Sequence, residues 1–110
     1  MRAERILIGA GTPAFDVYVH RLRREIAAMV AALGGLDALV FTGGVGEHQP
    51  AVRAAAGAGL GFLGIDVDPE ANGAVTGDGE IGAAAAPVRT LVVTAREDLE
   101  ISRQVRRLLG

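Results

Sequence analysis

The chain has 110 residues, half of them hydrophobic and 4% aromatic, and its formal net charge is −2 at pH 7. This length builds one modest domain or part of a larger one. The acidic balance excludes the basic surface of a nucleic-acid binder, and the absence of cysteine excludes a disulfide framework. Because the sequence shows neither a signal peptide nor a run as long as a membrane span, a cytoplasmic protein is expected.

The first predicted elements are a short strand over residues 5–11 and a long helix. Thr12 and Pro13 are typical of an N-cap and of the first helical position. Apolar residues then recur at helical spacing until Gly34 and Gly35, which predict the end of the helix. These apolar residues are Phe15, Val19, Leu22, Ile26, Met29 or Val30, and Leu33.

The clearest strand covers residues 36–42, where the run ALVF is typical of a strand buried on both faces. A glycine-rich loop follows, and a second helix is expected to begin near Gln49 or Pro50. After it, the segment 60–82 is rich in loop-forming residues, with a short strand expected over residues 62–67.

A second buried strand is predicted over residues 88–94 (VRTLVVT), followed by a helix from about residue 96 to residue 109. This helix has apolar residues at helical spacing. Helices thus alternate with buried strands, which predicts an α/β fold with a partly parallel sheet covered by helices.

The loop after the first buried strand is the best candidate for a pocket. Glycine carries no Cβ and accepts positive φ, so backbone N–H groups at residues 43–46 can approach a ligand closely. In open α/β sheets, ligands bind beyond the carboxyl ends of the strands. The spacing G-G-x-G matches neither the P-loop nor the dinucleotide-binding fingerprint. The loop is therefore either a ligand-binding loop or a tight turn between a strand and a helix.

The motif DALVFTGGVGEH, at residues 37–48, resembles the VFTGGIGEN segment of the acetate kinase family. The helix before it, the stretch LGFLGIDVDPEAN and the closing segment VRTLVVTAREDLEISRQVRRLL resemble that family in the same order. The resemblance extends from Ala14 to the C-terminus, whereas residues 1–13 match poorly. We therefore interpret residues 1–110 as the C-terminal segment of an acetate kinase-like ATP-binding domain.

The resemblance implies part of a ribonuclease-H-like α/β domain, of the superfamily that joins acetate and sugar kinases with heat-shock chaperones and actin. It also implies transfer of the γ-phosphoryl group of ATP to acetate, which gives acetyl phosphate and ADP. Propionate is the substrate of close relatives, and the segment does not distinguish the two acids. The implied cofactors are ATP or ADP and Mg²⁺.

The resemblance places the adenosine end of the nucleotide on the glycine loop. His48 stands where many family members have asparagine, and both side chains donate and accept hydrogen bonds. The alternative for His48 is a residue at the start of a helix that faces water. The implied nucleotide-contact residues are Gly43, Gly44, Val45, Gly46, Glu47 and His48.

Glu97 lies where the family has a carboxylate associated with magnesium. One carboxylate is sufficient, since Mg²⁺ keeps several waters and phosphate oxygens as ligands. The segment TARED has one more residue before the helix than the family's TNEE-type segment, so Asp98 is the alternative. Thr94 and Glu97 also have the spacing of a capping box, a role compatible with metal binding.

Other polar residues are interpreted as structural or solvated. For Arg53, a solvated position on the second helix is favoured over contact with the nucleotide. His20 is interpreted as a structural residue of the first helix. Asp66 and Asp68 alternate along the expected strand and share a face, which favours a solvated strand end over a metal site.

No catalytic residue is assigned, because the family's phosphate-binding strands and its catalytic arginines, histidine and aspartate precede this region. The isolated chain is therefore expected to be inactive. The expected partners are ATP and acetate or propionate, together with a second copy of the chain or a complementing amino-terminal half; neither nucleic acid nor membrane is expected. The alternative function is a non-catalytic α/β module for nucleotide binding or protein interaction.

Overall fold

The computed structural model describes residues 13–95 and 98–110. The strand expected over residues 5–11 and the cap expected at Thr12 lie outside them. In chain order the elements are α1 (Pro13–Leu33), β1 (Ala38–Thr42), α2 (Gly44–His48), α3 (Pro50–Ala58), the 3-10 helix η2 (Gly61–Leu63), α4 (Pro69–Ala74), β2 (Gly79–Glu80), β3 (Arg89–Val93) and α5 (Asp98–Leu109). None of the described helices is long and apolar enough to cross a membrane.

The described strands form one sheet in the order β1-β3-β2. β1 and β3 are parallel, with Ala38 opposite Arg89, and β2 runs antiparallel to β3. This confirms the partly parallel α/β sheet and the positions of both predicted strands. The burial predicted for the second strand is confirmed in β3, whereas the predicted burial of the first strand on both faces is wrong, because only Phe41 of β1 is buried. The strand expected over residues 62–67 is wrong: the segment forms η2, and it pairs only through isolated bridges at Ile65 and Val67. The left-handed backbone of Gly64, with φ of 91°, separates η2 from the two residues that form these bridges.

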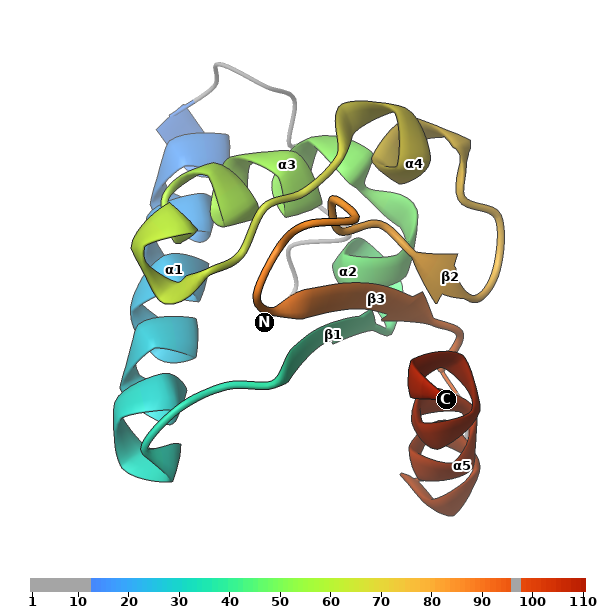
Figure 1. Ribbon diagram of the computed structural model, residues 1–110. Coiled ribbons are helices and arrows are strands. Elements are labelled where there is room, and N and C mark those ends of the chain that lie inside the picture. Colours follow the sequence, from blue (N-terminus) through green and yellow to red (C-terminus); the bar gives the residue numbers. More distant parts are fainter. Residues whose placement is uncertain (1–12, 96–97) are drawn as a thin grey trace.

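The helices surround the sheet unevenly. Figure 1 shows α3 and α4 above the sheet, with α1 and α5 at its opposite ends. α1 packs on α3, and α5 packs on β3. The Arg89 side chain donates from Nη1 and Nη2 to the carbonyl oxygens of Leu109 and Leu108, at 2.9 and 3.1 Å. A guanidinium at the carboxyl end of a helix satisfies carbonyls that lack helical partners, so this contact ties the end of α5 to the sheet.

The hydrophobic core lies between α1, α3 and the sheet. In β3 the residues Leu91, Val92 and Val93 are almost completely buried, as their uninterrupted apolar run predicted. The predicted apolar face of α1 is confirmed in its period, but only its first half is covered. Met29 and Leu33 are 61% and 68% exposed and border an open groove of about 290 Å³.

Two helical glycines differ in what surrounds them. A Cβ added at Gly57 in α3 would lie 2.7 Å from Cγ2 of Val67, whereas one added at Gly73 in α4 meets nothing within 4 Å. Because alanine is favoured over glycine in helices, we expect Gly73→Ala to raise the free energy of unfolding by about 0.5–1 kcal/mol. We expect Gly57→Ala to lower it by about 1–3 kcal/mol, because Val67 must move. Urea denaturation of both variants measures the difference, and equal stabilisation would contradict the close packing.

Candidate functional site

The glycine loop leaves β1 and forms α2 at once. Gly43 has φ of 73° and ψ of 153°, a backbone conformation that is almost restricted to glycine. The predicted helix does begin at Pro50, as α3. The interpretation of residues 43–46 as a loop is wrong in part, because Gly44–His48 form the short helix α2. Gly43, Gly44 and Gly46 have low helix propensity, so the sequence pattern did not predict α2.

The side chains of α2 point to different surroundings. Val45 is buried in a cluster with Phe15, Val19 and Val52, so a ligand would reach it only through its backbone. The His48 side chain is 75% exposed, and its Nε2 lies 3.8 Å from Oε1 of Glu47. The Glu47 carboxylate accepts hydrogen bonds through Oε2 from the backbone N–H groups of Gly43, at 2.9 Å, and Ala95, at 2.8 Å.

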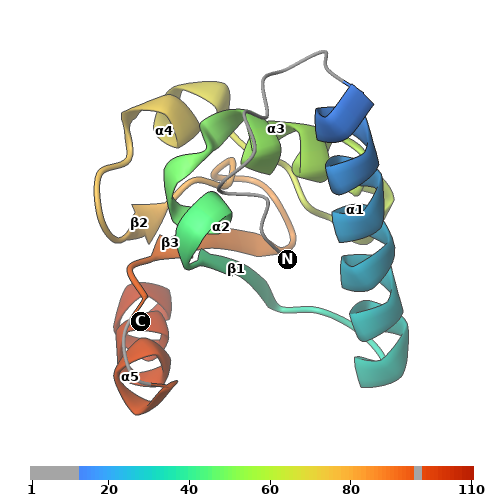
Figure 2. The ribbon, with the colours of Figure 1, turned by 180° about the vertical axis from the view of Figure 1, so that it is seen from behind.

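A cavity of about 410 Å³ opens beside these residues. Because β1 and β3 are parallel, their carboxyl ends meet at one edge of the sheet. Thr94, directly after β3, and Glu47 and His48 of α2 line the cavity, whereas the predicted nucleotide-contact residues Gly43, Gly44, Val45 and Gly46 are not among its lining residues. Figure 2 shows α2 beside the ends of these two strands. The position agrees with the general location of ligands in α/β sheets. Arg53 of α3 lines the cavity as well, and so do Thr76 and Gly77, which come later in the chain.

Arg53 is the largest fully buried side chain of the described residues, and it is only 1% exposed. Its Nη1 donates to the carbonyl oxygens of Gly46, at 3.0 Å, and Glu47, at 2.8 Å. Its Nε and Nη2 donate to Oδ1 and the carbonyl oxygen of Asn72, at 2.7 and 3.0 Å. Burial lowers the pKa of this guanidinium from its ordinary value. The interpretation of Arg53 as a solvated residue is therefore wrong.

Sequence reasoning missed this network because its partners are distant or belong to the backbone. Asn72 is 19 residues from Arg53 and is itself buried, and its Nδ2 donates to the carbonyl oxygen of Pro50 at 2.9 Å. No charged residue at helical spacing from Arg53 marks the pairing in the sequence. Together the two side chains fix α4 and the carboxyl end of α2 against α3.

The aspartates before α4 do not form the strand end that their alternation predicted. Asp68 is the N-cap of α4, and its Oδ2 accepts from the backbone N–H of Ala71 at 3.1 Å. This is the usual role of aspartate at a helix start. Asp66 is exposed, as expected, and lies beside a larger cavity.

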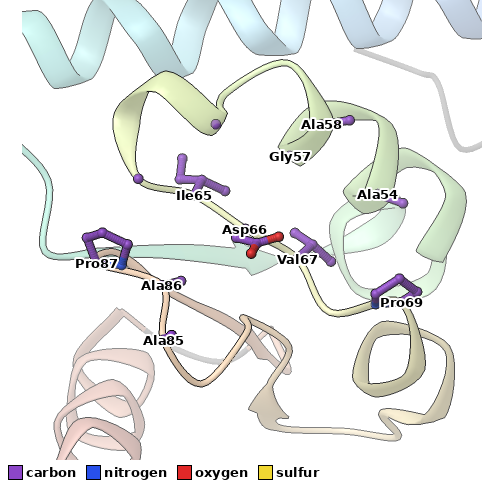
Figure 3. A pocket seen from close by; sticks show the side chains of 12 residues that line it. Ala54, Gly57, Ala58, Ile65, Asp66, Val67, Pro69, Ala85, Ala86 and Pro87 are labelled. Carbon is purple, nitrogen blue, oxygen red and sulfur yellow. The ribbon is translucent and has the colours of Figure 1, made fainter.

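That larger cavity, of about 680 Å³, shares no lining residue with the cavity beside α2. Figure 3 shows Ala54, Gly57 and Ala58 of α3 facing Ala85, Ala86 and Pro87, with Asp66 between them. Small apolar residues dominate the lining, and Asp66 supplies its single charge. Because none of the described residues that line this cavity is a cation, they offer no charge to neutralise a phosphate group.

The predicted metal site lies at the limit of the described residues. Glu97 is outside them, and Asp98 is the first residue of α5. The backbone N–H of Thr94 donates to Oδ1 of Asp78 at 2.7 Å. The described part of the chain contains no group of three potential metal-binding side chains. The role of Glu97 in binding magnesium, and its capping box with Thr94, therefore stay predictions.

The chain is similar to known proteins in both sequence and structure. The model of the Acetokinase family matches residues 9–103. The acetate kinase of Gloeobacter violaceus is 52% identical over 91 residues, which are 83% of this chain and 22% of that protein. The acetate kinase of Leifsonia xyli subsp. xyli is 54% identical over 92 residues, which are 83% of this chain and 23% of that protein.

Solved structures of an acetate kinase and a propionate kinase are also similar to this chain. The crystal structure of Porphyromonas gingivalis acetate kinase matches with a TM-score of 0.73 and 34% identity, over 88% of this chain and 25% of that one. A propionate kinase from Francisella tularensis matches with a TM-score of 0.70 and 27% identity, over 97% and 28% of the two chains. These matches confirm the expected α/β fold as a partial domain. The chain spans about a quarter of the length of the proteins it matches.

Proposed function

We propose, from the premise that this chain belongs to the acetokinase family, that it forms the adenosine-binding part of an acetate kinase. The complete reaction transfers the γ-phosphoryl group of ATP to acetate or propionate. The observation that supports this proposal is the cavity of about 410 Å³ between α2 and the turn after β3. Of the motif that resembles the family's nucleotide-contact segment, Glu47 and His48 line this cavity.

The cavity has the features that a nucleoside requires. Its volume is within the ordinary range for small-molecule sites. Gly43 does not line the cavity, but a Cβ added there would meet nothing within 4 Å, so the space over this neighbouring backbone is open to a base or a ribose. The exposed imidazole of His48 can donate or accept a hydrogen bond, as asparagine does in relatives. We assign contacts with adenosine to the backbone of residues 43–46 and to the His48 side chain.

The phosphate end of ATP needs more charge than the described residues provide. Phosphoryl transfer depends on metal ions and cations that neutralise the transferred group. Arg53 lines the cavity, but its side chain already donates four hydrogen bonds to the protein. Glu97, with Asp98 as the alternative, is the proposed magnesium carboxylate. We therefore propose that the isolated chain binds nucleotide weakly and does not catalyse the reaction.

Catalysis in this proposal requires a complementing amino-terminal half, and the chain also forms a homodimer. ATP and acetate or propionate are the proposed small-molecule partners. The proposed compartment is the cytoplasm. Membership of the acetokinase family supports the proposed assembly, substrates and compartment.

The test of the adenosine-binding role uses ligands that represent each end of the nucleotide. Adenosine, added to the ¹⁵N-labelled chain, is expected to shift the amide resonances of Gly43, Gly44 and His48. Tripolyphosphate without magnesium is expected to leave them in place. If neither adenosine nor ATP moves these resonances in a folded sample, the proposal fails and a non-catalytic module remains.

The magnesium carboxylate can be assigned with two conservative substitutions. In the wild type we expect Mg²⁺ to tighten ATP binding about tenfold, the equivalent of one favourable contact of about 1.4 kcal/mol. We expect Glu97→Gln to lose this dependence on Mg²⁺ and Asp98→Asn to keep it, because one carboxylate is enough to hold the ion. Isothermal titration with and without Mg²⁺ measures both. The opposite pattern would transfer the role to Asp98.

A further inference from the structure

Glu47 connects two parts of the chain that are distant in sequence. Its Oε2 accepts from the N–H of Gly43, directly after β1, and from the N–H of Ala95, shortly after β3. The two N–H···O distances are 2.9 and 2.8 Å. Because one oxygen accepts both hydrogen bonds, the carboxylate joins the carboxyl ends of the two parallel strands directly.

The Glu47 residue is itself held in place. Its side chain is only 11% exposed, and its backbone carbonyl accepts from Nη1 of the buried Arg53 at 2.8 Å. Hydrogen bonds from backbone N–H groups to a carboxylate are shorter and about twice as strong as neutral ones. The connection between the two strand ends is therefore a rigid one.

A second carboxylate acts on the same turn after β3. Thr94 donates its backbone N–H to Oδ1 of Asp78, at 2.7 Å, while the next residue, Ala95, donates to Glu47. Two consecutive amides are thus bonded to carboxylates from different parts of the chain, Glu47 in α2 and Asp78 directly before β2. In the sequence, Ala95 comes shortly before α5, which begins at Asp98, and the proposed magnesium carboxylate Glu97 lies between them in chain order.

We infer that Glu47 is a positioning residue, whose carboxylate sets the separation between the glycine loop and the turn that precedes α5. This inference rests on the proposed function for its consequence. If adenosine binds the loop and magnesium binds beyond the turn, Glu47 fixes the distance between the two ends of the nucleotide site. Its carboxylate acts on the nucleotide through Gly43 and Ala95.

The direct test needs no nucleotide. Hydrogen exchange of the ¹⁵N-labelled chain reports the protection of the Gly43 and Ala95 amides. We expect Glu47→Ala to lower both protection factors about tenfold or more, the effect of losing a hydrogen bond to a charged group. Glu47→Gln is expected to restore part of the protection, because its amide oxygen still accepts both bonds. Glu100→Ala, which removes an exposed carboxylate of α5, is the matched control and is expected to change neither amide.

A further substitution tests transmission between the two strand ends. We expect Asp78→Asn, which weakens the bond to Thr94, to lower the protection of Gly43 severalfold when Glu47 is present and to leave it unchanged in Glu47→Ala. Unchanged protection of the β3 amides in every variant shows that the sheet stays folded. Full protection of Gly43 and Ala95 in Glu47→Ala, or loss at one amide alone, would overturn the inference.

Titration of the same samples with ATP and Mg²⁺ separates the inference from the proposed function. We expect Glu47→Ala to bind ATP at least about tenfold more weakly than the wild type and Glu47→Gln to recover part of the affinity. Equal affinity of Glu47→Ala and the wild type would overturn the positioning role. Absence of ATP binding by the wild type would overturn the proposed function, while the exchange data would still decide whether Glu47 joins the strands.

Discussion

Arg53→Ala is expected to lower the free energy of unfolding by about 3–5 kcal/mol, as loss of a buried hydrogen-bond network does. The guanidinium occupies a site that is almost closed to water and donates four hydrogen bonds. Without it, the carbonyl oxygens of Gly46 and Glu47 and both oxygens of Asn72 lose a donor. Each buried acceptor left without a partner costs about 1–3 kcal/mol, and the vacated volume adds a cavity term.

Two other substitutions show whether this effect depends on the shape of the guanidinium. Arg53→Lys keeps the charge but replaces the planar guanidinium by a point charge. We therefore expect it to lower the free energy of unfolding by more than half as much as Arg53→Ala does. Arg103→Ala is the surface control: this arginine is 57% exposed and pairs with Glu100 on α5. Its removal is expected to change stability by less than about 0.5 kcal/mol. Urea denaturation followed by circular dichroism compares the variants, and equal midpoints for Arg53→Ala and Arg103→Ala would contradict the network.

Gly44→Val is expected to reduce ATP affinity at least about tenfold, a loss of about 1.4 kcal/mol or more. Gly44 has φ of 22°, which a β-branched residue adopts only with strain, and it is the first residue of α2 at the rim of the proposed site. A valine there also places a side chain where the backbone is proposed to meet adenosine. Isothermal titration with ATP and Mg²⁺ measures the change against the wild type.

The control for Gly44→Val is Gly61→Val. Gly61 lines the larger cavity, and a Cβ added there meets nothing within 4 Å. Its substitution is expected to leave ATP affinity unchanged. If Gly44→Val binds ATP as the wild type does, the glycine serves only the turn between β1 and α2. If neither the wild type nor Gly44→Val binds ATP although both are folded, the chain is a non-catalytic module of this fold.

The elements that the sequence predicted well are those whose signal is local and periodic. β3 ends in the apolar run LVV and is buried from Thr90 to Val93, and α1 repeats apolar residues at helical spacing and begins at Pro13. The extent of burial did not follow from the pattern, because the exposure of Met29 and Leu33 depends on what covers α1 and not on its own period.

The sequence indicated which segment contributes to the candidate site, but it did not indicate how the side chains there are arranged. The resemblance marked residues 43–48, and the parallel register brings that segment beside Thr94. Two connections stayed hidden, that of Arg53 with Asn72 and that of Glu47 with Ala95. Both join residues far apart in the chain, and two of their three hydrogen bonds involve a backbone atom, which leaves no trace in residue identity.

The register between β1 and β3 also determines when this protein can fold. Nearly half of the chain lies between the two strands in the sequence, yet they pair directly with each other in the described sheet. Closing such a long segment costs entropy before the strand contacts offset it, so domains dominated by distant pairings fold slowly. On a ribosome, α1, α2 and α3 emerge well before their sheet can be completed. The proposed nucleotide site, which includes residues after both strands, can consequently form only once β3 has been synthesised.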